Sequence, residues 1–527
     1  MAYKSYTLKI VEDNQEKIML ENSNNKVIAK NTIILYMRMM VIMLVSLYTS
    51  RVILKVLGVD DFGLYQAVCG IVGFIVFINN ALSTGTSRFL TYALGEKDYP
   101  KLNNTFSTAL ACHIILGFII VLIAETGGIW MVYHKLVIPP ERLEAALFAY
   151  HFSIATTVFS IILIPYNAII IAREKMSFFA YVSIAEVFLK LLIVFVLNVG
   201  DIDKLKLYSI LLFIVQLCIF IIYWVYCRHY FPEAKSPIRI VKNVFNQIIG
   251  FSVWSLFAGC SIALNNQGII VLLNMFFSSP VVVARTISLQ VNSAISQFVN
   301  NFRTAVNPQI VKRLASGERS SSQSLLLAST KYSYFLTFII VLPLYFLTPQ
   351  VLHLWLGEVP EYTTIFTRLI LIQSLFQVFD TCFYTALYAE GRLRENALIS
   401  PTLGFLMFPL VYVLFKLGYP AVALSWVFLL YYAFLGLVVK PFLIIKISQY
   451  TWNGVLQVFG SCLLITLLSI PLPILVNIFL PHTSRYFSVC LLSASFLSPL
   501  ISVWFLGLDN NTRHNLILFI KNKVHIK

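Results

Sequence analysis

Long apolar runs, separated by short polar stretches, dominate the chain from residue 32 almost to its last residues. Each run has the roughly 20 residues that an α-helix needs to cross the hydrocarbon core of a bilayer. Division at polar, glycine, proline and charged breaks predicts about fourteen transmembrane helices. Their predicted starts are near residues 32, 62, 104, 143, 177, 205, 246, 281, 332, 364, 395, 420, 454 and 486. The second, seventh and eighth are more polar than the others, and the predicted fold class is all-α.

Composition makes the chain an integral membrane protein. Of its 527 residues, 59% are hydrophobic and 12% are charged, and the mean hydropathy is +0.82. These values are far from those of a soluble globular protein. The first thirty residues are polar and carry no signal-peptide core, so we expect the N-terminus to stay in the cytoplasm. The eight cysteines form no CxxC pair and no spacing with histidine, which favours small core residues over metal ligands or disulfides.

The net charge of +16 follows from membrane topology and does not indicate nucleic acid. With both termini in the cytoplasm, 26 of the 39 Lys and Arg residues fall on the inner side and seven on the outer side. This bias is the one that inner-membrane proteins show. Six basic residues remain inside predicted spans, and they need another explanation: Arg38, Arg51, Lys55, Lys190, Arg285 and Arg303.

A weak internal repeat predicts the domain organisation. Residues 63–96 can be laid over residues 285–318, an offset of 222, so that both stretches end in a Gly-Glu pair. This relation predicts two six-helix lobes as parallel repeats, plus two C-terminal helices. The predicted parts are a cytoplasmic N-terminal segment (1–30), an N-lobe with spans 1 to 6 (31–230), a cytoplasmic linker (231–245), a C-lobe with spans 7 to 12 (246–450), spans 13 and 14 (451–508) and a basic cytoplasmic tail (509–527).

Residues 31–96, NTIILYMRMMVIMLVSLYTSRVILKVLGVDDFGLYQAVCGIVGFIVFINNALSTGTSRFLTYALGE, resemble the opening of bacterial polysaccharide flippases. These belong to the multidrug, oligosaccharidyl-lipid and polysaccharide exporter superfamily. The resemblance implies a two-lobed, V-shaped bundle in the bacterial cytoplasmic (inner) membrane. It also implies a function: movement of undecaprenyl-diphosphate-linked oligosaccharide repeat units from the inner to the outer leaflet by alternating access, for O-antigen, lipopolysaccharide or capsule assembly.

The predicted helix from Arg285 to Arg303 has one polar face from end to end. Asn292, Ser296 and Asn300 point to the same side as the two arginines, within an arc of about 80°. A polar stripe within a span normally lines a water-filled cavity, because hydrocarbon would leave its groups without partners. We therefore predict a cationic central cavity in which these five residues bind the diphosphate and sugar head of the cargo. The alternative is that each arginine snorkels to its nearer interface.

Arg51, in the first span, is a further candidate for binding the cargo. Lys55 lies one turn later on the same face, whereas Arg38 lies on another side of the helix and nearer its inner end. Arg38 is therefore either a snorkelling anchor or a cavity residue. Asp60 and Asp61 are possible partners of Arg51, and pairing with them would make Arg51 a structural clamp.

Two carboxylates within spans are candidates for energy coupling. Glu186 and Lys190 have the i, i+4 spacing of an ion pair, which favours mutual neutralisation, and uptake of a coupling ion by Glu186 is the alternative. Asp380, with Gln373 and Gln377 one and two turns earlier, is the other candidate. We expect no cofactor, with transport driven by an H⁺ gradient, an Na⁺ gradient or the membrane potential.

Other functions are less compatible with the sequence. A multidrug exporter of the same superfamily would hold cationic drugs on acidic residues, but the charges within these spans are mainly basic. A membrane enzyme of polysaccharide assembly would carry its catalytic residues in a long outer loop or a histidine motif, and neither is present in the chain. No enzymatic activity is expected. The expected partners are the lipid-linked oligosaccharide, membrane lipids and polysaccharide polymerase or assembly proteins.

Overall fold

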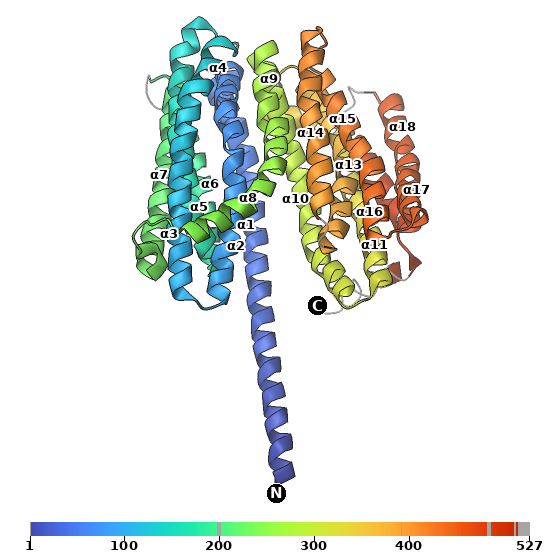
Figure 1. Cartoon of the computed structure of the whole chain (residues 1–527). Coiled ribbons are helices and arrows are strands. Elements are labelled where there is room, and N and C mark those ends of the chain that lie inside the picture. The colour runs from blue at the N-terminus through green and yellow to red at the C-terminus, as the bar shows by residue number, and fades with distance from the viewer. Residues whose placement is uncertain are drawn as a thin grey trace. The chain divides into compact units, whose positions relative to one another are not determined.

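The structure is a computed structural model that describes residues 2–173, 175–197, 202–390, 393–481, 486–510 and 513–514. Helices with short connections make up this part of the chain, and no strand occurs in it (Figure 1). The all-α prediction is therefore confirmed. Helices suit the sequence because they satisfy every backbone N–H and C=O within one segment, which lipid cannot do.

The described residues of the first half of the chain form eight α-helices. They are α1 (Ala2–Ile75), α2 (Phe77–Gly95), α3 (Tyr99–Ile123), α4 (Ile129–His134), α5 (Leu143–Ala172), α6 (Met176–Val196), α7 (Lys204–Tyr230) and α8 (Lys242–Ala263). Short 3₁₀ turns, η2 (Pro140–Arg142) and η3 (Pro232–Lys235), precede α5 and follow α7. Gly58 interrupts α1 with φ 80° and ψ 170°, a conformation that glycine adopts at no steric cost.

The second half, where the structure describes it, contains eleven α-helices. They are α9 (Ile269–Phe276), α10 (Ser279–Ala315), α11 (Arg319–Phe346), α12 (Thr348–Leu356), α13 (Thr363–Ala389), α14 (Leu393–Lys416), α15 (Ala423–Phe434), α16 (Lys440–Ser448), α17 (Trp452–Ser469), α18 (Pro471–Phe479) and α19 (Phe487–Ser502).

Among the residues that the structure describes, four π-helical turns lie within or at the end of long spans. They are η1 (Ala124–Gly128), η4 (Leu264–Gly268), η5 (Leu435–Val439) and η6 (Val503–Gly507). The first three join α3 to α4, α8 to α9 and α15 to α16. A π turn accommodates one extra residue and bends the helix without ending it, and such turns are frequent at functional sites.

Twelve stretches of the described residues are long and apolar enough to cross a membrane. They correspond to twelve of the fourteen predicted spans, and the chain is a multi-pass membrane protein. The other two are the second and eighth spans, which the sequence marks as polar. The second begins after Gly58, within the stretch Met37–Ile75, and continues through α2. The eighth is α10, whose polar face lowers its hydropathy.

The chain divides into two compact units. Unit 1 contains Met1–Ser50, Asn79–Leu122 and His151–Ser252. Unit 2 contains Arg51–Ile78, Ile123–Tyr150 and Val253–Lys527. The division crosses several helices, α1 and α5 among them, so each of these contributes residues to both units. The domain ranges drawn from the sequence follow chain order and stay a prediction.

Aromatic side chains build the interior of each unit. In unit 1, the rings of Phe159 and Phe213 meet edge to face at 5.7 Å. In unit 2, α10, α11 and α13 lie side by side (Figure 1), and Tyr334 stacks on Phe379 at 5.3 Å. Many large apolar residues elsewhere are exposed, such as Leu463 on α17 at 59%. Exposure on this scale suits contact with lipid.

Within unit 2, the segment of α1 after Gly58 packs closely on the start of the second half of the chain. A Cβ atom on Gly63 would lie 2.6 Å from the Cβ of Ser279, and one on Gly70 would lie 3.2 Å from Val271. Only glycine permits the first of these approaches. This contact fixes the N-terminal end of α10, which carries the predicted polar stripe.

Candidate functional site

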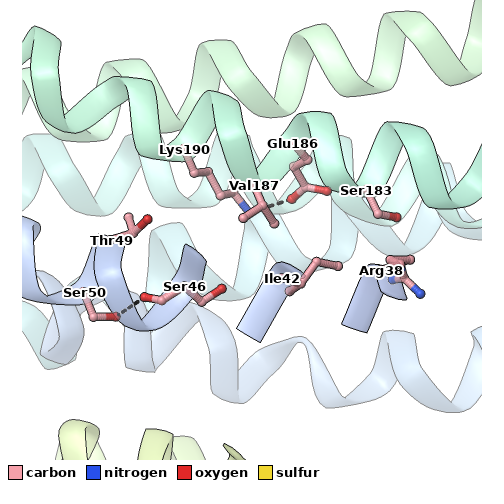
Figure 2. Close-up of a pocket in the computed structure, with 9 residues that line it drawn as sticks. All are labelled: Arg38, Ile42, Ser46, Thr49, Ser50, Ser183, Glu186, Val187 and Lys190. Carbon is pink, nitrogen blue, oxygen red and sulfur yellow. Dashed lines mark hydrogen bonds and ion pairs between the residues drawn. The ribbon is translucent and has the colours of Figure 1, made fainter. Parts of the chain in front are cut away.

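Unit 1 contains a polar pocket of about 360 Å³ between α1 and α6 (Figure 2). Five of its residues recur along one face of α1, and four recur along one face of α6. The lining consists of Arg38, Ile42, Ser46, Thr49 and Ser50 from α1, and of Ser183, Glu186, Val187 and Lys190 from α6. Seven of these nine side chains carry polar groups, which is unusual inside a hydrophobic helix pair.

Arg38 lies at one end of the pocket (Figure 2). Its guanidinium carbon stacks over the ring of Phe179, 4.2 Å from the centroid. The Nε atom is buried without a hydrogen-bond partner, and Glu186 is close enough for the two charges to attract. Arg38 is thus held inside the unit by an aromatic ring and an acidic neighbour, which favours the cavity interpretation over a snorkelling anchor.

Glu186 and Lys190 form an ion pair on α6. Lys190 Nζ donates to Glu186 Oε1 at 2.5 Å, and both side chains are partly open, at 43% for Lys190 and 29% for Glu186 (Figure 2). The pair has the geometry that the i, i+4 spacing predicts. Because each partner also reaches the pocket, a bound group can exchange with either of them. Uptake of a coupling ion by Glu186 stays a prediction.

The pocket hydroxyls differ in how they are satisfied. Ser183 Oγ donates to Phe179 O at 2.7 Å, and Ser50 Oγ donates to Ser46 O at 3.0 Å. Thr49 is 8% exposed, and its Oγ1 is buried without a partner. Two cationic groups, one carboxylate and several hydroxyls give the pocket a formal charge of +1, counting Arg38, Lys190 and Glu186. This set can bind an anionic oxygen together with sugar hydroxyls.

In unit 2, Arg285 is buried within the helix bundle at 2% exposure. Its guanidinium carbon lies 5.3 Å from the ring centroid of Phe428 on α15. The Nε and Nη1 atoms have no hydrogen-bond partner. The snorkelling alternative therefore does not apply to Arg285 in this structure, since its guanidinium does not reach the surface. Contact with the cargo stays a prediction.

Arg303 and Asn292 point from α10 to α13. Arg303 Nη2 donates to the carbonyl of Thr381 and, at 2.8 Å, to the hydroxyl of Thr385. Asn292 Nδ2 donates to Gln377 Oε1 at 3.4 Å. Part of the predicted stripe thus forms interhelical hydrogen bonds, which also accounts for polar residues on a span.

One exposed side of α10 is polar as well. Ser293 and Asn300 are exposed, and Ser296 is half-buried. Ser293 and Asn300 are seven residues apart and therefore lie on the same side of the helix. An exposed polar face in a membrane-spanning helix favours contact with water over contact with lipid.

A second ion pair lies inside unit 2. Lys440 Nζ is 3.0 Å from Asp380 Oδ1, and the side chain of Lys440 is 3% exposed. Lys440 counts among the basic residues assigned to the inner side, but its side chain is buried against α13, because the π turn η5 places it at the start of α16. Sequence periodicity gives no signal for such a turn. Asp380 as an ion-coupling residue stays a prediction.

Arg51 is exposed, and its Nη1 donates to the carbonyl of Leu354 on α12 at 3.2 Å. Asp61 does not form the suggested clamp with Arg51. It pairs with Arg142 through two contacts instead. Arg51 and Arg38 belong to different units. Its role in binding cargo stays a prediction.

The sequence identified Glu186 and Lys190 but not the pocket around them. Ser46 lies eight residues after Arg38, and Ser50 lies four residues after Ser46. A polar stripe on α1 was therefore available as a signal in the sequence. Among the described residues, no group of His, Cys, Asp and Glu has an arrangement that could hold a metal ion. All eight cysteines are free thiols.

Comparison with known proteins gives the fold. No family model matches the chain, and no curated protein matches it in sequence. Among solved structures, the lipid II flippase MurJ in an inward closed conformation is similar at a TM-score of 0.65 and 12% identity, over 89% of this chain and 98% of that chain. A transporter of the MOP superfamily from Pyrococcus furiosus, described as having a binding pocket of reverse polarity that suggests a different function, is similar at 0.58 and 13%, over 80% and 97%.

A multidrug resistance MATE transporter in its outward-facing conformation is similar at a TM-score of 0.58 and 14% identity, over 80% of this chain and 96% of that chain. These proteins are transporters or flippases. The chain therefore has the fold of transporters of the MOP superfamily, and the all-helical, multi-pass architecture agrees with it.

Proposed function

We propose that this protein is a flippase that moves an anionic, lipid-linked oligosaccharide across the bacterial cytoplasmic membrane, with both termini in the cytoplasm. The proposed cargo is an undecaprenyl-diphosphate-linked repeat unit of O-antigen or capsule, carried from the inner to the outer leaflet by alternating access. The MurJ structure, a lipid II flippase, supports a lipid-linked cargo, and the sequence resemblance supports the repeat unit.

The observation that carries the proposal is an excess of arginine over carboxylate inside the units. Glu186 and Asp380 are each paired with a lysine. Arg285 and Arg303 contact no carboxylate among the described residues, and the Nε and Nη1 atoms of Arg285 have no hydrogen-bond partner. A guanidinium in a membrane interior is costly unless an anion or hydrogen-bond acceptor meets it. The diphosphate of the cargo supplies such an anion, and arginine binds phosphate oxygens through paired N–H donors.

The neutral polar groups suit the sugars of the same cargo. Sugar hydroxyls need both donors and acceptors, which the serines and threonine of the unit 1 pocket and the amides of α10 provide. No residue of this set forms a nucleophile and base arrangement, and the proposal includes no enzymatic step. Polysaccharide polymerase or other assembly proteins are proposed partners on the outer side.

A multidrug exporter is the alternative that the fold also permits. Such a protein would hold organic cations on free carboxylates. Here the ammonium groups of Lys190 and Lys440 already occupy Glu186 and Asp380. The charge balance therefore favours an anionic cargo.

The proposal is tested in cells from which the gene has been deleted. We expect loss of surface polysaccharide and accumulation of lipid-linked repeat units on the inner face, with both reversed by the wild-type chain. An Arg303→Gln chain, present at wild-type level, should restore little export, whereas Arg228→Gln, which removes an exposed arginine on α7, should restore it. Normal surface polysaccharide in the deletion strain would contradict the proposal. Sensitivity to cationic drugs without a polysaccharide defect would favour the exporter.

A further inference from the structure

The Asp380–Lys440 pair is unlike the other ion pair inside a span. Lys440 lies on α16 and Asp380 on α13, so the pair joins two helices, and only 3% of the lysine side chain is exposed. Glu186 and Lys190 share one helix, and Lys190 is 43% exposed. Water and dissolved ions therefore reach Lys190 readily, whereas the protein encloses Lys440 and leaves the Asp380 side chain 19% exposed.

The backbone fixes Lys440 in this position. Lys440 follows the π turn η5 directly and is the first residue of α16, with Pro441 next to it. Within η5, a Cβ atom on Gly436 would lie 2.6 Å from the carbonyl oxygen of Phe376, so η5 and α13 cross in close contact. The Lys440 ammonium also lies 5.5 Å from the ring centroid of Tyr384. The ammonium thus lies between a carboxylate and an aromatic ring, next to the close contact of η5 with α13. These neighbours leave it little space to move away from Asp380.

The Lys440 ammonium compensates the negative charge of the Asp380 carboxylate. Asp380 Oδ1 is buried and accepts no hydrogen bond, so its contact with Lys440 is the charge interaction that compensates its burial. An uncompensated carboxylate in a membrane interior is costly, and it takes up a cation or a proton when either is within reach. Titratable groups whose charges act on or beside this site are Tyr431, Tyr432, Cys382 and Arg303, and none of them is a carboxylate.

We infer that the Lys440 ammonium occupies the place of a coupling cation beside Asp380, so that unit 2 takes up no Na⁺ at this site. The chain carries its own cation, attached to α16, and the charge of the Asp380 site stays constant through a transport cycle. Removal of the ammonium should create a vacant cation site. The inference rests on the proposed function for its meaning in transport, because a fixed ammonium leaves this site unable to couple an Na⁺ gradient to cargo movement. The occupancy itself is tested without cargo.

The test measures thermal unfolding of the purified full-length protein in detergent, in NaCl and in choline chloride at equal ionic strength and fixed pH. The wild type should unfold at the same temperature in both salts. Lys440→Met should unfold at a lower temperature in choline chloride and should regain a few degrees in NaCl, because a cation that binds only the folded state stabilises it. Asp380→Asn with Lys440→Met lacks the carboxylate and should show no difference between the salts.

Lys101→Met provides a control, because its partner Glu96 is 39% exposed and water compensates the lost ammonium. This variant should show no specific response to Na⁺. A saturable Na⁺ stabilisation of the wild type would overturn the inference, as would a Lys440→Met protein that responds equally to both salts. If Lys440→Met does not fold, ²²Na⁺ binding to the wild type decides the question, and measurable binding that Asp380→Asn abolishes would overturn it. A failure of flipping would leave these results unchanged, so the two proposals fail separately.

Discussion

Arg142 binds Asp61 through two parallel contacts, Nε to Oδ1 at 2.8 Å and Nη2 to Oδ2 at 2.5 Å. Asp61 lies just after the break in α1 at Gly58, and Arg142 ends the 3₁₀ turn before α5. The pair therefore ties two connections that are 81 residues apart in the chain. It also leaves Arg51 to bind the carbonyl of Leu354 instead of an aspartate.

Loss of this contact should destabilise unit 2. Asp61→Asn removes the charge of the side chain but keeps its shape. We expect the free energy of unfolding to fall by about 1 kcal/mol, because the ion pair is bidentate but partly open to solvent. Thermal unfolding in detergent measures the change. Glu96→Gln breaks the pair of Glu96 with Lys101, whose side chains are both 39% exposed, and should have almost no effect. Equal losses of stability in the two variants would show that the Arg142–Asp61 pair contributes no more than an exposed surface ion pair.

The close packing of Gly63 on Ser279 gives a second prediction. Gly63→Ala places a methyl group 2.6 Å from the Ser279 side chain and 2.7 Å from its carbonyl oxygen, so α1 and α10 must move apart. We expect a lower unfolding temperature and a higher rate of protease cleavage near residue 278. Gly460→Ala is the matched control, since it adds a methyl group to the middle of α17 with nothing within 4 Å. That change should stabilise the protein slightly, because alanine favours helix over glycine. A neutral Gly63→Ala would mean that the contact is looser than the structure shows.

Under the proposed function, Glu186 should compete with the cargo for Lys190 in the unit 1 pocket. Because Lys190 donates to Glu186 at 2.5 Å, Glu186→Gln should free the ammonium and raise the affinity for the diphosphate head, by about tenfold if the pair contributes 1.4 kcal/mol. Lys190→Gln should lower the affinity and leave Glu186 to repel the anion. Direct binding of undecaprenyl diphosphate to the purified variants measures both. The prediction requires that the two variants change the affinity in opposite directions. A decrease of the affinity in both variants would indicate that the pair acts only in folding.

Arg303 should not be replaceable by lysine. Its guanidinium donates from one nitrogen to both the Thr381 carbonyl and the Thr385 hydroxyl, and its other N–H groups leave it able to bind an anion at the same time. Arg303→Lys keeps the charge but loses this geometry, and we expect transport to fall by about tenfold or more at an unchanged unfolding temperature. Initial rates at several cargo concentrations would separate binding from movement. Full transport activity of Arg303→Lys would show that Arg303 acts through its positive charge alone and not through the geometry of its guanidinium.

Much of the fold could be predicted because its signals are local. Span length and charge bias are properties of consecutive residues. Two of the three spans that the sequence marks as polar, the one after Gly58 and α10, are the ones missing from the twelve apolar stretches, whereas the seventh span is among them. The polar face of α10 follows from helical periodicity alone.

The site was harder to predict because it depends on which helices meet. Periodicity places Arg303 on a polar face, but it does not show that α13 would supply Thr381 and Thr385. Lys440 lies near the end of an apolar run, like any interfacial lysine, until the π turn η5 places it against Asp380. The pocket at Arg38 likewise requires that α6 lie against α1, which no local pattern encodes.

The most direct test of the account follows a labelled cargo across a bilayer. Purified protein is placed in liposomes with undecaprenyl-diphosphate-linked oligosaccharide that carries a fluorescent group on its sugar, and an impermeant reductant quenches the outer leaflet. We predict that quenching proceeds beyond the outer-leaflet share to nearly all of the label with the wild type and with Arg228→Gln. It should stop at the outer-leaflet share with Arg285→Gln combined with Arg303→Gln, and with a label on a lipid that has no phosphate. Quenching that stops at the outer-leaflet share with the wild type, or that is unaffected by loss of both arginines, would contradict the account.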